Sequence, residues 1–462
     1  MSARVFSRSV RIERPADEVF AWHERPGTFA RLAPPWEQIK LVGAHPGIRA
    51  GARVTVRSKI LGFTSEWVVE HCDYVAGRQF RDVMRKGPFA RWEHLHRIEP
   101  EGENACTLTD QITFELPLGA LGRGLAGAWV QRKLARMFAY RHAVTKADVE
   151  AASRYALEPR RRVLVSGASG LVARALIPFL ESQGHEVLRL VRRRPQCAAE
   201  IFWQPEAGEL DVVSAGRVDA VIHLAGENVA GGRWTLARKA AIMGSRVEGT
   251  RTLVEALQRL ERRPEVFISA SATGYYGFES EPPERMTEES PRGRGFLAEV
   301  CAAWESEAHR AAVSATRVAI MRFGVVLTPA GGALGKLLPL FRLGLGGALG
   351  SGSQGMSWIS ADDGVRAIYH VLMTRSCVGA FNVVAPMPVT NREFTAVLAK
   401  VLRRPAALAV PGGFMRLVLG GMAQEALLGG VQAVPVRLLA AGYHFQHEML
   451  EPALRHELGA EM

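Results

Sequence analysis

Hydrophobic and polar residues alternate along several short segments of the first 118 residues. Joined by stretches rich in turn formers, the segments read ARVTVRSKI, SEWVVEHCDYV, RQFRDVMRK, ARWEHLHRIEP and ACTLTDQITFEL. Such a period of two predicts an antiparallel sheet. The segment ADEVFAWHERPGTFARLAP before the strands has helical spacing. A long amphipathic helix is predicted after them, because apolar residues gather near one side of it: Trp129, Leu134, Met137, Phe138 and Tyr140.

The pattern changes near residue 155. Pro159 interrupts the helical spacing, and residues 156–161 are predicted to be a linker. Beyond it, strand-like and helix-like runs alternate as RVLVSG, ARALIPFLESQG, HEVLRLVR, VDAVIHLAG, SRVEGTRTLVEALQRL and EVFISASA. This alternation predicts an α/β domain of Rossmann type with a doubly wound parallel sheet. We therefore expect domains at 1–155 and 162–390, followed by a C-terminal helical module at 391–462.

The stretch at residues 332–360 contains too much glycine to be helical throughout. Asp362 and Asp363 follow it and precede the helix-like run GVRAIYHVLMTR. Because carboxylates accept hydrogen bonds from the free amides of a first helical turn, we expect this pair to cap the helix rather than to bind a metal.

Residues 163–176, VLVSGASGLVARAL, run from a strand through a glycine turn into a helix. Gly167 would allow a sharp turn, Gly170 a close approach of a pyrophosphate, and Ala173 close packing of helix on sheet. The loop is therefore predicted to bind a dinucleotide, with Ser169 among the contact residues. Its spacing is GxxGxxA rather than GxGxxG, and a tight turn without a ligand is the alternative.

Three arginines stand about 20 residues further on, where an acidic residue would hold the 2′-hydroxyl of NAD. They are Arg192, Arg193 and Arg194, and cations there suit a 2′-phosphate. The sequence thus favours NADP(H) over NAD(H), the alternative being a solvated basic loop. The small residues after the next predicted strand would pass under the adenosine: Leu224, Ala225 and Gly226.

Composition narrows the possible partners and location. The formal net charge of the 462 residues is +12, but the basic residues are mostly dispersed arginines, so we expect no nucleic-acid partner. The five cysteines form no CxxC pair, which favours reduced thiols in the cytoplasm. The N-terminus lacks the apolar region of a signal peptide, and the most apolar stretch is interrupted by Lys336 and Arg342. A soluble cytoplasmic protein is expected.

His94 and His96 are two residues apart in a predicted strand and would share one of its faces. Such a pair is able to hold a metal ion, but the sequence shows no third ligand nearby. We therefore expect two histidines hydrogen-bonded on a sheet or cavity wall, and no metal.

The N-terminal third resembles a known fold family. IERPADEVFAWHERPGTFARLAPPW and KGPFARWEHLHRIE are similar to segments of the START-like (SRPBCC) superfamily, in its polyketide-cyclase-like branch. The resemblance covers residues 1 to about 150. It implies an α+β helix-grip fold with a cavity for a hydrophobic ligand between sheet and helix, and it implies no reaction.

The remainder resembles an atypical branch of the short-chain dehydrogenase/reductase superfamily, whose members carry the label "epimerase family protein" and mostly lack a known substrate. The similar segments include VSGASGLVARAL, VIHLAGENVAGGRWT, VFISASATGYYG, MTEESPRGRGFLAEVCAAWE and FNVVAPMPVTNREF. This sequence departs from the branch at Ser360, where histidine is usual, and at Thr328, where glycine is expected. The resemblance implies cofactor contacts at Gly167, Gly170, Leu171, Val172, Arg192, Leu224, Ala225, Arg246 and Val326.

Reductases and epimerases of this superfamily use a Tyr-x-x-x-Lys pair beside a serine or threonine. Ser271 matches the serine, but no Tyr-x-x-x-Lys occurs anywhere in the chain. Tyr275 and Tyr276 are the candidate substitutes, with aromatic packing as their alternative role. Glu227 and Glu299 are further titratable candidates.

These observations leave three hypotheses. The first is an NADP(H)-dependent oxidoreductase or nucleoside-sugar-epimerase-like enzyme with unusual acid–base groups. The others are a non-catalytic NADP(H) sensor or scaffold, and a carrier of a hydrophobic ligand. The substrate is not defined by the sequence, and a homodimer stays open.

Overall fold

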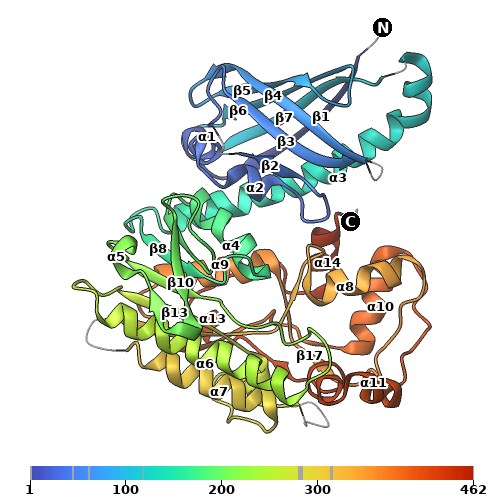
Figure 1. Ribbon diagram of the computed structural model, residues 1–462. Coiled ribbons are helices and arrows are strands. Elements are labelled where there is room, and N and C mark those ends of the chain that lie inside the picture. Colours follow the sequence, from blue (N-terminus) through green and yellow to red (C-terminus); the bar gives the residue numbers. More distant parts are fainter. Residues whose placement is uncertain are drawn as a thin grey trace. The chain divides into compact units, whose positions relative to one another are not determined.

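A computed structural model describes residues 3–43, 46–60, 63–117, 119–278, 285–312 and 316–460. The chain forms two compact units, one mainly from residues up to Pro159 and the other mainly from residues 160–455 (Figure 1).

The first unit contains a seven-stranded sheet in the order β1-β7-β6-β5-β4-β3-β2, in which every neighbouring pair is antiparallel. Its two edges are β1, which carries Arg4, Arg8 and Arg11, and the three-residue strand β2. The elements are β1 (Arg4–Ile12), α1 (Ala16–Glu24), α2 (Thr28–Leu32), β2 (Lys40–Val42), β3 (Arg53–Ile60), β4 (Phe63–Val75), β5 (Gln79–Lys86), β6 (Arg91–Pro100), β7 (Cys106–Glu115) and α3 (Gly119–Arg154).

Alternation of side chains explains how this sheet buries one face. Every second residue of β7 is buried, including Ile112 and Phe114, and these two pack with Leu134 and Phe138 of α3. Period-two strands closed by one long helix confirm the predicted antiparallel helix-grip arrangement. The same inward face also carries polar residues, described below.

The second unit contains an eight-stranded sheet in the order β11-β10-β9-β8-β12-β13-β15-β19, parallel except for β11. Its central strands are buried along almost their whole length, as expected when helices cover both faces. Helices α6 and α7 contact each other and lie side by side in Figure 1. The predicted Rossmann-type sheet is thus confirmed. The elements are β8 (Arg162–Ser166), α4 (Leu171–Ser182), β9 (Glu186–Val191), β10 (Glu200–Gln204), β11 (Glu209–Leu210), α5 (Val212–Ala215), β12 (Ala220–His223), α6 (Leu236–Gln258), β13 (Val266–Ala272), α7 (Phe296–His309), β15 (Arg317–Phe323) and β19 (Gly379–Val383).

Shorter elements complete this unit. The glycine-rich stretch forms one helix, α8, and then irregular chain, in agreement with its composition. Among the described residues, no helix is both long and apolar enough to cross a membrane. The elements are β14 (Arg285–Met286), β16 (Val325–Leu327), α8 (Gly332–Arg342), β17 (Gly355–Met356), β18 (Trp358–Ser360), α9 (Ala361–Met373), β20 (Val389–Thr390), α10 (Asn391–Leu402), α11 (Gly412–Leu419), α12 (Gly421–Ala423), β21 (Gln432–Ala433), α13 (Val436–Ala440) and α14 (Leu450–Leu458).

The prediction that Asp362 and Asp363 cap α9 is wrong, because the N-cap lies two and three residues before them. Ser360 is the N-cap, and its hydroxyl accepts from the amide of Asp363. Asp363 lies inside the first turn, where its carboxylate accepts from the amides of Gln446 and His447 at 2.8 and 3.0 Å. The aspartate therefore fixes a later loop, and the serine hydroxyl satisfies the helix end.

Candidate functional site

The glycine turn has the geometry of a phosphate-binding loop. Gly167 follows β8 with a φ of 69°, and a Cβ there would lie 2.8 Å from backbone atoms of Leu224 and Ala225. The Gly170 amide donates to the Gly167 carbonyl at 2.8 Å, and Ala173 is fully buried against the sheet. Ser169 and Gly170 are exposed at the start of α4. The loop therefore leaves helix amides open to an anion, which fits a dinucleotide pyrophosphate.

A buried histidine that the sequence pattern does not single out fixes the turn. Nδ1 of His223 lies 2.6 Å from Oγ of Ser166, and the same hydroxyl oxygen accepts from the amides of Leu224 and Ala225. Nε2 of His223 lies 3.0 Å from the hydroxyl of Thr250. Burial and the nearby Arg246 lower the pKa of His223 to about 3, so the ring is neutral. A histidine ending an otherwise apolar strand, in VIHLAG, was its only sequence signal.

The predicted selector arginines differ in how they are held. Arg193 donates to both carboxylate oxygens of Glu200, at 2.8 and 2.5 Å. Arg192 directly follows β9, and its side chain is 69% exposed with Glu206 3.7 Å away. Arg192 is therefore the one of the two that is available to an added phosphate.

Arg246 lies deeper than a simple phosphate contact would require. Its guanidinium donates to the carbonyls of Glu227 and Ile242, both at 3.1 Å, and stacks on Trp304. A Cβ at Gly226 would lie 3.1 Å from Cζ of this arginine. Arg246 thus supports the loop that begins at Leu224.

The chain after β16 lies against the side chain of Leu171, which follows the glycine turn. A Cβ on Gly331 or Gly332 would lie 3.1 or 3.0 Å from side-chain atoms of Leu171. The carbonyl oxygen of Val326 lies 3.6 Å from that same Cβ position on Gly332. The structure therefore brings together the predicted residues Leu171 and Val326, from opposite ends of the site.

Strand register brings the predicted cofactor and catalytic residues to one sheet edge. Ser166, His223 and Ser269 are neighbours across the parallel strands β8, β12 and β13. Gly167 and Ser271 hence both lie at the carboxyl ends of these strands, where ligands bind in open α/β sheets.

Ser271 belongs to a buried ion-pair network. Its hydroxyl donates to Oε1 of Glu305 at 2.6 Å. Arg322 donates to both oxygens of the same carboxylate, at 2.9 and 2.8 Å. All three side chains are buried, and the hydroxyl of Ser271 is held by the carboxylate of Glu305. No motif in the sequence singles out Glu305 or Arg322.

The two predicted tyrosines have different surroundings. Tyr276 is buried; its hydroxyl donates to Oδ1 of Asn382 at 2.7 Å and accepts from Arg322 at 3.0 Å. Burial raises the pKa of Tyr276 despite the guanidinium beside it. Tyr275 is half-buried, with its ring centroid 3.5 Å from Cζ of Arg322. Among the described residues, none hydrogen-bonds the Tyr275 hydroxyl. Of the three predicted catalytic groups, this phenol is the one open to a substrate.

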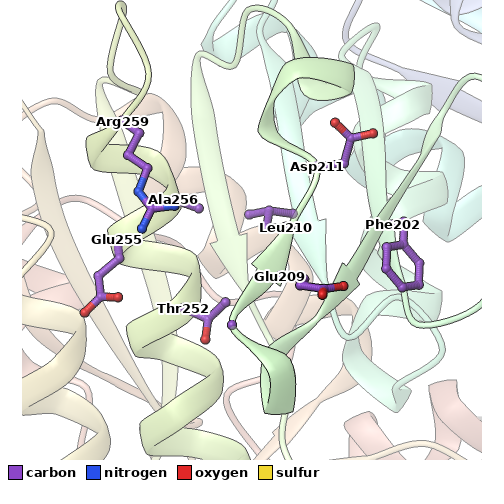
Figure 2. A pocket seen from close by; sticks show the side chains of 9 residues that line it. Phe202, Glu209, Leu210, Asp211, Thr252, Glu255, Ala256 and Arg259 are labelled. Carbon is purple, nitrogen blue, oxygen red and sulfur yellow. The ribbon is translucent and has the colours of Figure 1, made fainter.

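The other titratable candidates lie apart from this network. Glu227 pairs with Arg238 at 2.7 Å, and Glu299 is exposed on α7. A cavity of about 350 Å³ lies between the β10–β11 edge and the C-terminal half of α6, and Figure 2 shows its lining side chains. No predicted site residue lines it, so we assign it no role here. Its lining residues are Phe202, Gly208, Glu209, Leu210, Asp211, Thr252, Glu255, Ala256 and Arg259.

The expectation that His94 and His96 have no third ligand near them is wrong. Asp82, from the neighbouring strand, offers a carboxylate oxygen within 4.8 Å of a ring nitrogen of each histidine. Local sequence did not reveal this residue, because it comes from a different strand.

Comparison with protein families matches both units. Residues 163–384 match the NAD-dependent epimerase/dehydratase family, and residues 3–147 match the family described as polyketide cyclase / dehydrase and lipid transport. Residues 410–457 match a domain of unknown function.

Relatives define the class further. Over 63% of this chain, an epimerase family protein of Mycobacterium bovis is 42% identical, with 96% of its length covered. The chain therefore belongs to the NAD-dependent epimerase/dehydratase family. It is similar within that family to the proteins named epimerase family protein, joined here to a polyketide-cyclase-like N-terminal unit.

Two solved structures are informative. The nucleoside-diphosphate sugar epimerase of Corynebacterium glutamicum is 31% identical, with a TM-score of 0.79, and the match covers 99% of this chain and 90% of that one. Human epimerase family protein SDR39U1, solved with NADPH, is 33% identical with a TM-score of 0.59, over 65% of this chain and 99% of that one. The first match spans both units, and the second spans the Rossmann-type unit.

Proposed function

We propose that this protein binds NADP(H) at the glycine loop and acts as an oxidoreductase or nucleotide-sugar epimerase of atypical type. The observation that carries the NADP(H) choice is Arg192, which is exposed directly after β9 while Arg193 is held by Glu200. A relative solved with NADPH supports the same choice. The residues proposed to contact the cofactor are Gly167, Ser169, Gly170, Leu171, Val172, Arg192, Arg193, Leu224, Ala225, Gly226, Arg246 and Val326.

When bound, the nicotinamide supplies a hydride donor or acceptor. The chain's own residues bind and orient the cofactor and handle the proton. The amides after Gly167 hold the phosphates, and Arg192 selects the 2′-phosphate. Tyr275 holds the exchangeable proton, since its hydroxyl is not engaged by other described residues. Ser271 and Tyr276 act as positioning residues, because Glu305, Arg322 and Asn382 occupy their hydroxyl groups.

Titration of the purified protein with NADPH and with NADH, followed by nucleotide fluorescence, tests the cofactor proposal. Loss of a charge-assisted contact to the 2′-phosphate should weaken NADPH binding of Arg192→Ala about 10- to 100-fold and leave NADH binding almost unchanged. Arg259→Ala on α6 is the control for the same change of net charge. Equal losses for both nucleotides would reject the role of Arg192, and no binding of either would reject the cofactor site.

A second experiment tests the proton-transfer group. The protein loaded with NADPH or NADP⁺ is incubated with a panel of nucleotide sugars and apolar carbonyl compounds, and products are separated by chromatography. Where wild type turns over a compound, Tyr275→Phe should lower kcat at least 100-fold, as expected for loss of an acid–base group, with NADPH affinity unchanged. Tyr276→Phe is the matched control; a larger loss from it than from Tyr275→Phe would overturn the assignment.

A non-catalytic NADP(H) sensor is the second candidate function. This function is favoured by the absence of any Tyr-x-x-x-Lys in the sequence and by the hydrogen bond from the Ser271 hydroxyl to Glu305. Nucleotide binding without turnover of any panel compound would favour the sensor.

The N-terminal unit is proposed to hold a hydrophobic ligand, in keeping with the family matched by residues 3–147. Native mass spectrometry of the full chain would detect a co-purified lipid.

A further inference from the structure

A cluster of histidines and aspartates lies inside the first unit, outside the proposed cofactor site. Cross-strand register places Asp82 opposite both His71 and His94, and places Asp110 opposite His96. The cluster also includes a histidine of α3, and all its members are buried except the partly exposed Asp82. We call the following residues the histidine cluster: His71, Asp82, His94, His96, Asp110 and His142.

We propose that Asp82, His94 and His96 bind one divalent transition-metal ion of the zinc class. Nδ1 of His94 and Nε2 of His96 lie 3.7 and 3.5 Å from Oδ2 of Asp82. In a tetrahedral zinc site with bonds of about 2.0–2.1 Å, ligand atoms stand about 3.3–3.4 Å apart. Small side-chain movements therefore suffice for these three donors to share one ion.

Asp110 sets the two histidines for this role. Its Oδ1 lies 2.8 Å from Nε2 of His94 and 2.7 Å from Nδ1 of His96. In each ring this is the nitrogen that does not face Asp82. Nε2 of His94 is hydrogen-bonded to this oxygen of Asp110, and a carboxylate that takes the N–H of one ring nitrogen leaves the other nitrogen with a free lone pair, as in the outer shell of metal sites. The approach of Asp110 to Nδ1 of His96 is short but lacks hydrogen-bond geometry. Nε2 of His142 holds the second oxygen of Asp110 at 2.6 Å.

Asp82 is oriented in the same manner. Its Oδ1 lies 2.6 Å from Nδ1 of His71, which leaves Oδ2 toward His94 and His96. Each direct ligand thus has a partner on its far side. Such a set is pre-organised for coordination.

The charge balance suits a cation. Asp82 and Asp110 bring two carboxylates to the cluster, and each lies against histidine rings. The half-buried Arg141 interacts electrostatically with these two carboxylates. One guanidinium against two carboxylates leaves a net negative charge at the cluster when the histidines are neutral. The competing occupant is a proton on His96, whose pKa these carboxylates raise against the effect of burial.

Two histidines and one carboxylate leave a fourth position of a tetrahedral ion open. Aromatic rings border the ligand histidines, with Phe80 stacked on His96 at 4.1 Å and Phe138 5.2 Å from His94. The open position therefore suits water or the oxygen of an apolar ligand.

The full-length protein, stripped with a chelator and dialysed, is titrated with Zn²⁺ against a chromophoric competitor. We expect one tightly bound ion per chain. His94→Gln and His96→Gln should each weaken Zn²⁺ binding more than 100-fold, since loss of an outer-shell partner alone costs about 10- to 100-fold. The control is His444→Gln, an exposed residue of the second unit, which should bind as wild type does. Circular dichroism checks that each variant is folded.

Co²⁺ added to the stripped wild type gives a readout that does not depend on any variant. Intense visible absorption bands of tetrahedral Co²⁺, removed by one equivalent of Zn²⁺, would support the site. Failure of wild type to take up stoichiometric Zn²⁺, or wild-type affinity in a folded His94→Gln/His96→Gln double variant, would overturn it. The histidine cluster would then be a closed network in which His96 carries a proton.

Discussion

The two units each bury a polar network, and the two networks are completed by different means. In the second unit, the Arg322 guanidinium neutralises Glu305 with two hydrogen bonds and also donates to Tyr276. In the first unit, Asp82 and Asp110 face mainly histidines, which are neutral unless protonated. The guanidinium of Arg322 bonds Glu305 directly, whereas the single guanidinium of Arg141 offsets only part of the charge of Asp82 and Asp110, so that network depends further on a proton or a metal ion. Residue type thus decides which buried network is open to a ligand.

The largest expected effect tests the complete network. Arg322→Met leaves the Glu305 carboxylate buried without its partner, and should lower the free energy of unfolding of the second unit by about 3–5 kcal/mol. Urea denaturation measures this. Glu305→Leu combined with Arg322→Met should recover most of the loss, because the uncompensated charge is then absent.

Arg310→Met is the matched control, since Arg310 pairs with Glu307 at an exposed position. Little change is expected there. A comparable loss in Arg310→Met would mean that burial does not distinguish the two pairs.

The histidine cluster is tested through Asp110, which is not one of the three proposed ligands. Asp110→Asn removes the negative charge that holds His94 and His96, and should weaken Zn²⁺ binding about 10- to 100-fold. Competition titration with a chelator measures the affinity. Asp73→Asn, at an exposed aspartate paired with Arg81, should leave the Zn²⁺ affinity unchanged. If the two variants behave alike, Asp110 does not position the ligands.

A pH measurement tests a buried histidine whose ring nitrogens have hydroxyl groups, not carboxylates, as partners. His223 contacts only Ser166 and Thr250 through its ring nitrogens, and its pKa is lowered to about 3 in the folded state. Below pH 6.5 the unfolded chain takes up a proton that the folded chain does not bind until about pH 3. The second unit should therefore lose about 2 kcal/mol of stability from this residue between pH 6.5 and pH 5.

His223→Gln should remove this part of the pH dependence. Urea denaturation at pH 7 and at pH 5 gives the difference for wild type and variant. The same pH slope in both proteins would show that His223 does not supply it.

The sequence predicted the features that depend on neighbouring positions along the chain. Period-two strands predicted the first sheet, and the run from Val163 to Ala173 predicted a strand, a glycine turn and a helix, as the structure has them. The sequence pattern favours Asp362 and Asp363 as the cap of α9, but the hydroxyl of Ser360 accepts from the amide of Asp363. Only the structure shows that the Asp363 carboxylate is occupied by the amide of Gln446 in a later loop.

The polar networks could not be predicted, since their members are distant in sequence. Ser271 and Glu305 are 34 residues apart, and Arg322 is a further 17 along the chain. Asp82 meets His94 only through the pairing of β5 with β6. A shift of that pairing by one residue would turn the aspartate to the other face of the sheet. The pairing register of the strands, which a single sequence does not specify, determines which residues meet in the two polar networks.

The edges of the first sheet have a consequence for the behaviour of the protein at high concentration. An edge strand exposes unpaired amides and carbonyls, and a second molecule can add its own strand there, which is how fibrils grow. β1 places Arg4, Arg8 and Arg11 along one edge, and the other edge is formed by the three-residue β2 and by the residues of β3 that β2 does not pair. Strand addition at β1 would bring like charges together, and β2 offers too short a template. The arginines of β1 therefore oppose the addition of a second molecule's strand at that edge.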